Sequence, residues 1–150
     1  MIYEDELTGT KLINLEKADP DDFEDTVYIG GEADFYDYEH SVHANPYSVN
    51  EQTGREAQEK YKTHFYRKIL EDEEYLEDVL DLKGKTLLSW MYPQHDHGEI
   101  IIKFLRNHED EDVDIYDFIK EELEELDTSM LGIETLEDKE AAEEIIKEKY

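Results

Sequence analysis

The sequence predicts an α/β domain that contains a small sheet with flanking helices and continues into an acidic helical extension. Two short apolar runs, residues 26–29 and 86–91, have the composition of buried strands. The segments between and after them show the apolar spacing of helices. Strands that alternate with helices are typical of α/β folds. We therefore expect an α/β domain over residues 1–107 and an acidic helical extension over residues 108–150.

The first predicted strand, Thr-Val-Tyr-Ile at residues 26–29, ends at Gly30 and Gly31, since consecutive glycines favour a turn. The acidic segment before it, residues 1–23, contains a single apolar alternation at residues 12–15. A long loop follows the two glycines and is rich in tyrosine, histidine and turn-forming residues.

A helix is predicted over residues 55–70 and a shorter one over residues 73–81. The apolar residues of the longer helix recur at i, i+4 spacing along one side and are Ala57, Tyr61, Phe65 and Ile69. A turn at residues 83–85 then leads into the second predicted strand, residues 86–91.

The isoleucines at residues 100–102 favour a strand by composition alone. We nevertheless expect a helix over residues 98–107, because Ile101, Phe104 and Leu105 keep helical spacing.

Two helices are predicted in the extension. The first follows Asp114, and the second begins at Thr135, whose spacing to Asp138 is a variant of the capping box. The apolar residues expected in the core are Ile115, Ile119, Leu123 and Leu126 of the first helix and Leu136, Ala142, Ile145 and Ile146 of the second.

The charge of the chain excludes some classes of function. Its 43 Asp and Glu residues against 15 Lys and Arg residues give a formal net charge of −28. Such a chain repels nucleic acid and anionic membranes at long range, so we expect neither direct nucleic-acid binding nor membrane association. No apolar run approaches the roughly 18 residues of a membrane span.

Four explanations compete for this charge: intrinsic disorder, mimicry of nucleic acid, adaptation to molar salt, and an ordinary acidic composition. Disorder is disfavoured by 11 Tyr, 5 Phe and the periodic apolar segments. We favour salt adaptation, because the acids are spread from Glu4 to Glu148 and the Debye length is only about 3 Å in 1 M salt. The expected setting is the high-salt cytoplasm of a halophilic archaeon or of its virus-infected host.

Several kinds of site are not expected. The absence of cysteine excludes disulfides, thiolate metal sites and a cysteine nucleophile. His95 and His97 have the spacing of a metal-binding pair, with His40 and His43 as candidate further ligands, but the sequence places no third ligand beside the pair. The acids at 110, 112 and 114 resemble an EF-hand loop that lacks its essential glycine. The sequence therefore predicts no metal ion and no cofactor.

An island of positive charge lies in the predicted helix 55–70. It contains five of the 15 cationic residues, namely Arg55, Lys60, Lys62, Arg67 and Lys68. These residues can neutralise acidic neighbours within the fold, or they can form an anion-binding site. Both interpretations remain open at this point.

The junction between the second strand and the next helix, residues 89–98, is the best candidate site. In α/β sheets, ligands bind where strands end and helices begin, and Gly98 would let a ligand approach the helix. We expect Arg55 and Lys62 to hold negative charge, Trp90 or Tyr92 to stack on a ligand, and His97 to donate or accept a proton. The remaining residues that we place around this cleft are Gly30, Gly31 and Asn45.

The ordered motifs of the chain resemble the domain-of-unknown-function family numbered 4326. They are residues 27–30 (Val-Tyr-Ile-Gly), 45–47 (Asn-Pro-Tyr), 55–57 (Arg-Glu-Ala), 82–91 (Leu-Lys-Gly-Lys-Thr-Leu-Leu-Ser-Trp-Met) and 97–101 (His-Gly-Glu-Ile-Ile). The family occurs in bacteria, archaea and their viruses, and no biochemical role is established for it. The resemblance implies a small α/β core over about residues 26–106 and the location of a site, and it names no reaction.

The chain departs from the family pattern at four positions. Gly31 stands where an arginine is typical, and Ser89, Met91 and Asp96 stand where the family has cysteines. If the family's cysteines carry chemistry, this chain keeps only His97 of that group. The function we expect is binding, with or without processing, of a small anionic ligand of nucleotide type. The alternative is an interaction protein, such as a viral inhibitor that presents carboxylates to a DNA-binding partner.

Overall fold

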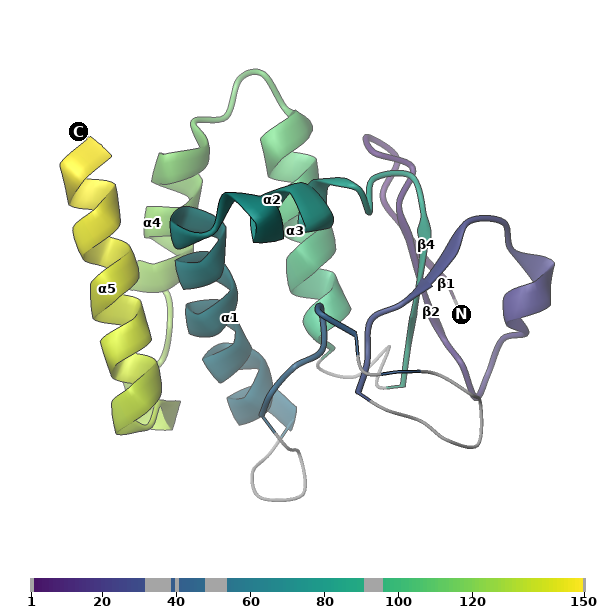
Figure 1. Cartoon of the computed structure of the whole chain (residues 1–150), viewed down its shortest axis with the longest axis horizontal. Helices are drawn as coiled ribbons and strands as arrows, with labels where there is room; N and C mark the ends of the chain where they lie inside the picture. The colour runs from purple at the N-terminus through teal and green to yellow at the C-terminus, as the bar shows by residue number, and fades with distance from the viewer. Residues whose placement is uncertain (1, 32–38, 40, 48–53, 91–95, 150) are drawn as a thin grey trace.

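The fold is a four-stranded sheet with its α-helices gathered on one face (Figure 1). The computed structural model describes residues 2–31, 39, 41–47, 54–90 and 96–149. The strands are β1 (Ile2–Glu4), β2 (Lys11–Asn14), β3 (Thr26–Tyr28) and β4 (Thr86–Ser89). The helices are η1 (Pro20–Asp22), α1 (Gly54–Glu71), α2 (Glu73–Leu80), α3 (His97–Glu109), α4 (Ile115–Glu124), η3 (Thr128–Met130) and α5 (Ile133–Lys149).

The sheet has the strand order β1-β2-β4-β3, in which β2, β4 and β3 are parallel and β1 is antiparallel to β2. The apolar alternation at residues 12–15 therefore contains a strand, β2, that the sequence analysis did not assign. Asn14 at the end of β2 pairs in register with Ser89 at the end of β4, and Tyr28 of β3 pairs with Leu88. The three parallel strands thus end at one edge of the sheet.

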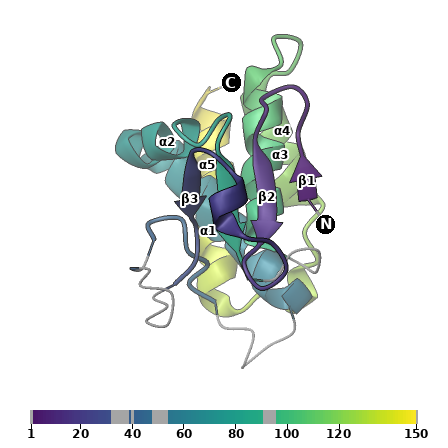
Figure 2. The ribbon, with the colours of Figure 1, turned by 90° about the vertical axis from the view of Figure 1, so that its right-hand side faces the viewer.

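The two faces of the sheet pack against different layers. Leu12, Leu87 and Ile29 face the helices and belong to the main core. Leu88 and Trp90 belong to a smaller cluster on the opposite face. Figure 2 shows the connection that contains η1 passing in front of the sheet, with α1 and α3 behind it. The chain therefore leaves β2 over one face and leaves β4 over the other.

The predicted helices are confirmed with small shifts in their ends. The α3 segment is a helix although it contains three consecutive isoleucines, because Ile100, Ile101 and Ile102 are all buried in the core. The last helix begins at Ile133, two residues before the expected start. Thr135 consequently lies inside its first turn, where its hydroxyl donates to the carbonyl of Gly132 at 3.0 Å instead of capping the helix.

The acidic extension shares the core of the α/β domain. Ile119 and Leu123 of α4 and Ala142 and Ile146 of α5 are buried in the same cluster as Phe65 of α1. Helix α5 runs beside α1 in Figure 1. Among the residues that the structure describes, no helix is both long and apolar enough to cross a bilayer.

Candidate functional site

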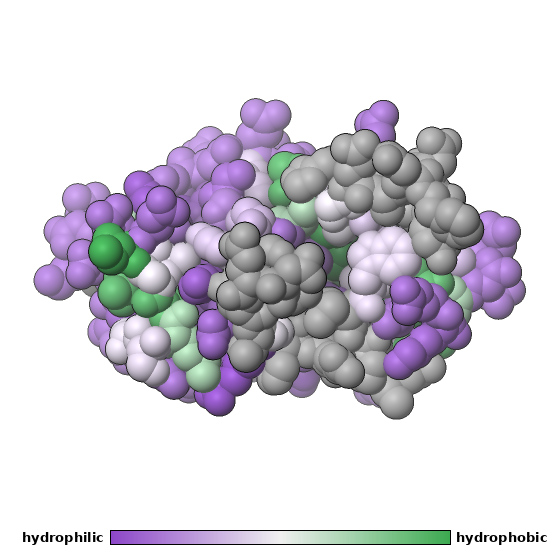
Figure 3. All heavy atoms as spheres, turned by 90° about the horizontal axis from the view of Figure 1, so that it is seen from below, coloured by the Kyte–Doolittle hydropathy of each residue, from purple (hydrophilic) through white to green (hydrophobic). Residues whose placement is uncertain are grey.

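The carboxyl ends of β2, β4 and β3 meet the amino end of α3, and Figure 3 views the molecule from that end. After β2 the chain continues along one face of the sheet to η1, and after β4 it continues to α3 on the other face. The space between the carboxyl ends of these two adjacent strands is therefore a topological switch point. Ligands of open α/β sheets bind at such points. Asn14 and Ser89, paired in register, lie on the two sides of this gap.

Asn14 joins the end of β2 to the residue that follows β4 through a side-chain hydrogen bond. It is 5% exposed, and its Nδ2 donates to the carbonyl of Trp90 at 2.9 Å, while its Oδ1 accepts from the amide of Glu16 at 2.8 Å. Ser89 is also buried, and its Oγ has no hydrogen-bond partner among the described residues. A buried hydroxyl without a partner is unusual in a native fold and calls for an explanation.

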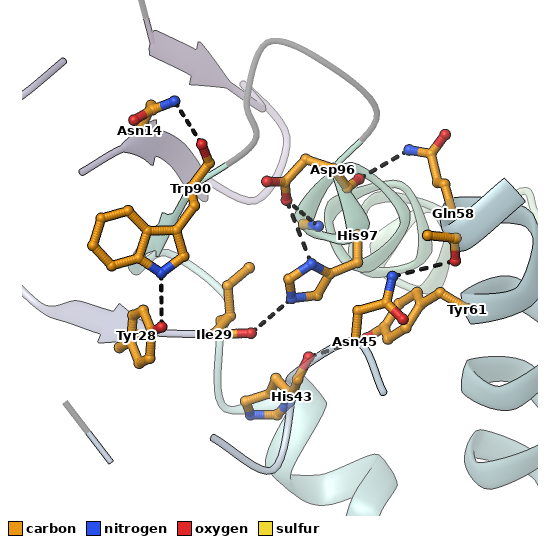
Figure 4. Close-up of polar contacts among 12 residues, drawn as sticks. Asn14, Tyr28, Ile29, His43, Asn45, Gln58, Tyr61, Trp90, Asp96 and His97 are labelled. Carbon is orange, nitrogen blue, oxygen red and sulfur yellow. Dashed lines mark hydrogen bonds and ion pairs between the residues drawn. The ribbon is translucent and has the colours of Figure 1, made fainter. Parts of the chain in front are cut away.

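His97, the first residue of α3, is bonded to the end of β3 (Figure 4). Its Nε2 lies 2.6 Å from the carbonyl oxygen of Ile29. A carbonyl can only accept, so Nε2 carries the proton and Nδ1 of the neutral ring carries the lone pair. Nδ1 lies 3.8 Å from Oδ1 of Asp96, and the ring meets Tyr61 edge-on at a centroid distance of 5.1 Å. The nitrogen that could exchange a proton is therefore Nδ1, beside a carboxylate.

Asp96 caps α3. Its carboxylate accepts from the amide of Gly98 at 2.6 Å, and its side chain is fully buried. A negative charge at this position stabilises the helix through the unpaired amides and the helix dipole. The cap also occupies the amide that an anion at this helix end would otherwise approach.

Gly98 allows α3 to pack closely on the sheet. A Cβ at this position would lie 2.7 Å from Cδ1 of Leu12 and 3.0 Å from Cδ1 of Ile29. The space around Gly98 is thus filled by the apolar core rather than left open for a ligand.

Trp90 lies on the other side of the sheet edge from His97 (Figure 4). Its Nε1 donates to the hydroxyl of Tyr28 at 2.8 Å, and the two rings meet edge-on at 6.3 Å. The Tyr28 hydroxyl in turn donates to the carbonyl of Gly31. A Cβ at Gly30 would collide with that same tyrosine, so both glycines lie against the Tyr28–Trp90 pair.

Asn45 joins the loop after β3 to the start of α1. Its Nδ2 donates to the carbonyl of Ala57 at 3.2 Å, and its Oδ1 accepts from the amide of Tyr47 at 2.9 Å. Two residues earlier, the carbonyl of His43 accepts from the hydroxyl of Tyr61 at 3.5 Å. Asn45 and His97 therefore lie near the same end of α1, as Figure 4 shows.

Part of the positive island has a structural role. Arg67 pairs with Glu71 at 3.0 Å and with Asp138 of α5 at 2.7 Å. The ammonium group of Lys68 lies 4.8 Å from the ring centre of Tyr75, a cation–π contact. Arg67 thus neutralises acidic neighbours, and Lys68 has an aromatic contact within the fold.

Arg55 and Lys62 are placed differently. They lie three residues before and four residues after Gln58, so the three side chains share one side of α1. Gln58 Nε2 donates to the carbonyl of Asp96 at 2.9 Å, which places this side beside the start of α3. Neither Arg55 nor Lys62 forms an ion pair with another residue in the described part of the chain. The pKa of Asp127 is lowered chiefly by hydrogen bonds from Ser129 and, to a smaller extent, by the charge of Arg55.

Burial governs the titration of the groups behind the site. It raises the pKa of Tyr61 well above its ordinary value and raises the pKa of Tyr75 to about 12, so both remain phenols. Burial also lowers the pKa of His43; the charge of His97 lowers it further, and Asp78 opposes the shift. Tyr61 and Tyr75 therefore contribute no charge to this part of the core, and burial favours the neutral form of His43.

The sequence analysis missed several residues that build this edge: Asn14, Gln58 and Tyr61. Their side chains bond to backbone groups distant in sequence, which leaves no local pattern. Tyr92 and His95 lie outside the described residues. No group of three metal-binding side chains is found within the ranges that the structure describes.

Comparisons with known proteins give one match. The model of a family described as "Domain of unknown function (DUF4326)" matches residues 13–107, which run from the second half of β2 through β3, α1, α2 and β4 and end two residues before the end of α3. The chain has no significant match among curated proteins or solved structures. The matched region contains the whole candidate site, whereas α4 and α5 lie beyond it.

Proposed function

Since this chain belongs to the DUF4326 family, whose name assigns no activity, we propose its function from the site: the protein binds a small anionic ligand of nucleotide type at the sheet edge. The ligand would lie across the ends of β2 and β4, beside the first turn of α3. The proposal assigns no reaction, because Nε2 of His97 already donates a hydrogen bond to the backbone carbonyl of Ile29.

The observation that carries the proposal is the pair of cations Arg55 and Lys62 beside the start of α3. Arg67, on the same helix, has two acidic partners, whereas Arg55 and Lys62 form no ion pair with a described residue. Most of the 15 cationic residues share this property, so the position of Arg55 and Lys62 beside the start of α3 is what distinguishes them. An anionic group placed between them would supply the missing countercharge.

The aromatic residue lies at the opposite end of the same edge. Trp90 is half-buried, and its ring lies against Tyr28 on the face of the sheet away from α1. A ligand that reaches from Lys62 to Trp90 must be elongated, with charge at one end and a flat group at the other. A nucleotide has this form, and stacking on an aromatic ring stabilises a base by about 1–3 kcal/mol. Ser89 directly precedes Trp90 at the end of β4, and its buried hydroxyl has no hydrogen-bond partner among the described residues.

Thermal-shift measurements with nucleotides test the proposal. AMP, ATP, adenosine and inorganic phosphate are added separately to the protein in concentrated KCl. Binding at about 100 times Kd raises the free energy of unfolding by about 2.7 kcal/mol, or about 5–10 °C in Tm. We expect stabilisation by a nucleotide and none by adenosine.

Variants identify the site. Arg55→Gln and Lys62→Gln should abolish most of the nucleotide-induced shift, because each removes one of the two cations. Lys60→Gln is the matched control, since Lys60 lies on a different side of α1 from Gln58. A flat response of the wild type to the whole panel would rule out the small-ligand function.

A second candidate function is an interaction protein that imitates nucleic acid. The observation in its favour is a stripe of exposed acids along α5, formed by Glu137, Glu140, Glu144 and Glu148 at helical spacing. The partner would be a DNA-binding protein that recognises this array. In that case the Arg55 and Lys62 variants would still bind the partner protein, and a variant with reversed charges on α5 would no longer bind it.

We also propose that the protein works in the high-salt cytoplasm of a halophilic archaeon or its virus-infected host. The support is the net charge of −28, spread over the whole chain. Such a charge destabilises a compact state by self-repulsion unless salt screens it.

A further inference from the structure

The loop segment 41–47 lies between the end of β3 and the start of α1 and is attached to both. The amide of Ser41 donates to the carbonyl of Gly30 at 2.9 Å. Asn45 bonds to the carbonyl of Ala57, and Tyr61 bonds to the carbonyl of His43. The segment thus contacts the turn that adjoins Trp90 and the first turns of α1, which carry Arg55 and Gln58.

His43 is at the centre of this segment and is 5% exposed. The groups that face it come from three helices: Tyr61 of α1, Tyr75 and Asp78 of α2, and His97 of α3. Its ring lies 6.3 Å from that of Tyr75. Its Nδ1 is buried and has no hydrogen-bond partner among the described residues.

This environment accepts a neutral His43 and disfavours a charged one. The neutral ring can leave its lone pair on Nδ1, whereas the charged ring places a proton on both nitrogens. A buried donor without an acceptor costs about 1–3 kcal/mol. His97 adds repulsion when it is charged, and Asp78 gives only partial compensation. Water relieves this cost if the segment moves away from the helices.

We propose that segment 41–47 is a proton-sensitive latch on the ligand site, which closes when His43 is neutral and is released when His43 takes up a proton. Release breaks the attachments at Gly30, Ala57 and Tyr61 together. The two ends of the ligand site are then no longer held in one geometry, and ligand affinity falls in mild acid. The effect on affinity rests on the proposed function, whereas the movement of the latch does not.

The direction of the pH dependence follows from the lowered pKa of His43. Below the ordinary value of about 6.5 the released state binds more protons than the closed state, so closure weakens as the pH falls. The loss begins near that value and continues down to the lowered pKa of the closed state. His64 and His108 also have pKa values lowered chiefly by partial burial of their rings, so the contribution of His43 must be isolated by substitution.

The ligand-free protein provides the first test. Trp90 is the only tryptophan of the chain and is linked through Tyr28 to the glycine turn that Ser41 contacts. We expect its fluorescence to change, and amide exchange of residues 41–47 to accelerate beyond the intrinsic pH effect, between about pH 7.5 and 5.5. His43→Gln cannot titrate and should show neither change. His64→Gln, the matched control, should behave like the wild type.

The outcomes are distinguishable. A histidine NMR titration that gives His43 a pKa at or above about 6.5 overturns the latch, and this measurement needs only the wild-type protein. A His43→Gln variant that keeps the full fluorescence transition overturns it as well. AMP affinity is then measured at both pH values, with an expected loss of at least about threefold in the wild type and none in His43→Gln. If AMP does not bind at any pH but the pH-dependent movement of segment 41–47 is observed, the proposed function is wrong and the latch is confirmed.

Discussion

His97 donates from Nε2 to the carbonyl oxygen of Ile29 at 2.6 Å, and this bond joins the first residue of α3 to the residue that follows β3. Both groups are buried, so the bond satisfies a backbone acceptor that has no access to water. It also fixes the imidazole tautomer, which leaves Nδ1 toward Asp96. The histidine of the family-like motif therefore has a positional role in the fold, whatever its role toward a ligand.

Replacing His97 should destabilise the protein. His97→Ala leaves the Ile29 carbonyl unpaired and opens a cavity beside Tyr61, so we expect a loss of about 2–4 kcal/mol in the free energy of unfolding. Urea denaturation followed by circular dichroism measures this loss. His108→Ala is the control, because that side chain is exposed and should cost under about 1 kcal/mol. Equal effects of the two substitutions would contradict the assignment.

Gly98→Ala tests the close packing of α3 on the sheet. The added methyl group would overlap Leu12 and Ile29, so we expect a loss of about 1–3 kcal/mol from overpacking. Gly132→Ala is the matched control, since no atom lies within 4 Å of its Cβ position. Thermal melts compare the two variants. If Gly98→Ala melts at the same temperature as the control, the space around Gly98 is not filled by the core and the close-packing interpretation is wrong.

Tyr66 and Glu122 connect the α/β domain to the extension. The hydroxyl of Tyr66 donates to Glu122 at 3.3 Å, and Lys103 donates to the other carboxylate oxygen at 3.0 Å. Tyr66→Phe should cost about 1 kcal/mol, and a double-mutant cycle with Glu122→Gln should give a coupling of about 0.5–1.5 kcal/mol. Lys103→Gln should cost more than a typical surface ion pair, because it removes the countercharge of the buried Glu122 carboxylate. A coupling of zero would mean that the buried contact contributes nothing.

Removal of residues 108–150 should abolish cooperative folding. The deletion takes away Ile119, Leu123, Ala142 and Ile146 and exposes the apolar side of α1. Burial of each such side chain is worth about 1.5–3 kcal/mol, so the loss approaches the whole stability of a typical domain. Size-exclusion chromatography and thermal melts of the shortened chain check this expectation. A monomer with a sharp melt would show that residues 1–107 fold alone.

Salt should stabilise the fold. The net charge of −28 repels itself strongly where the Debye length is about 10 Å, and much less where it is about 3 Å. We expect Tm to rise by several degrees, of order 5–15 °C, between about 0.1 M and 1 M KCl. NaCl should act like KCl if screening is the cause. A Tm that is independent of salt would rule out salt adaptation and favour mimicry.

Much of the fold could be predicted because its elements have local patterns. The helix α1 has its apolar residues at regular spacing, and β3 ends at two glycines, so each is readable within a few residues. The strand β2 was missed, since its four residues sit in an acidic segment and gain their stability from β4, more than seventy positions later. The extent of α5 was nearly right, but the helix starts at Ile133, and Thr135 lies inside its first turn instead of capping it.

The sequence by itself determined the α/β class, most of the helices, the position of the sheet edge and the charge that surrounds the whole molecule, since all of these depend on composition or short-range periodicity. Only the tertiary structure decided what the candidate site residues do. In the folded chain Arg67 forms ion pairs and Lys68 forms a cation–π contact, whereas Arg55 and Lys62 form no ion pair in the described part of the chain. Trp90 and His97 lie on different sides of the sheet edge. These differences arise from contacts between residues far apart in sequence, and a side chain's partners are fixed only when the chain has folded.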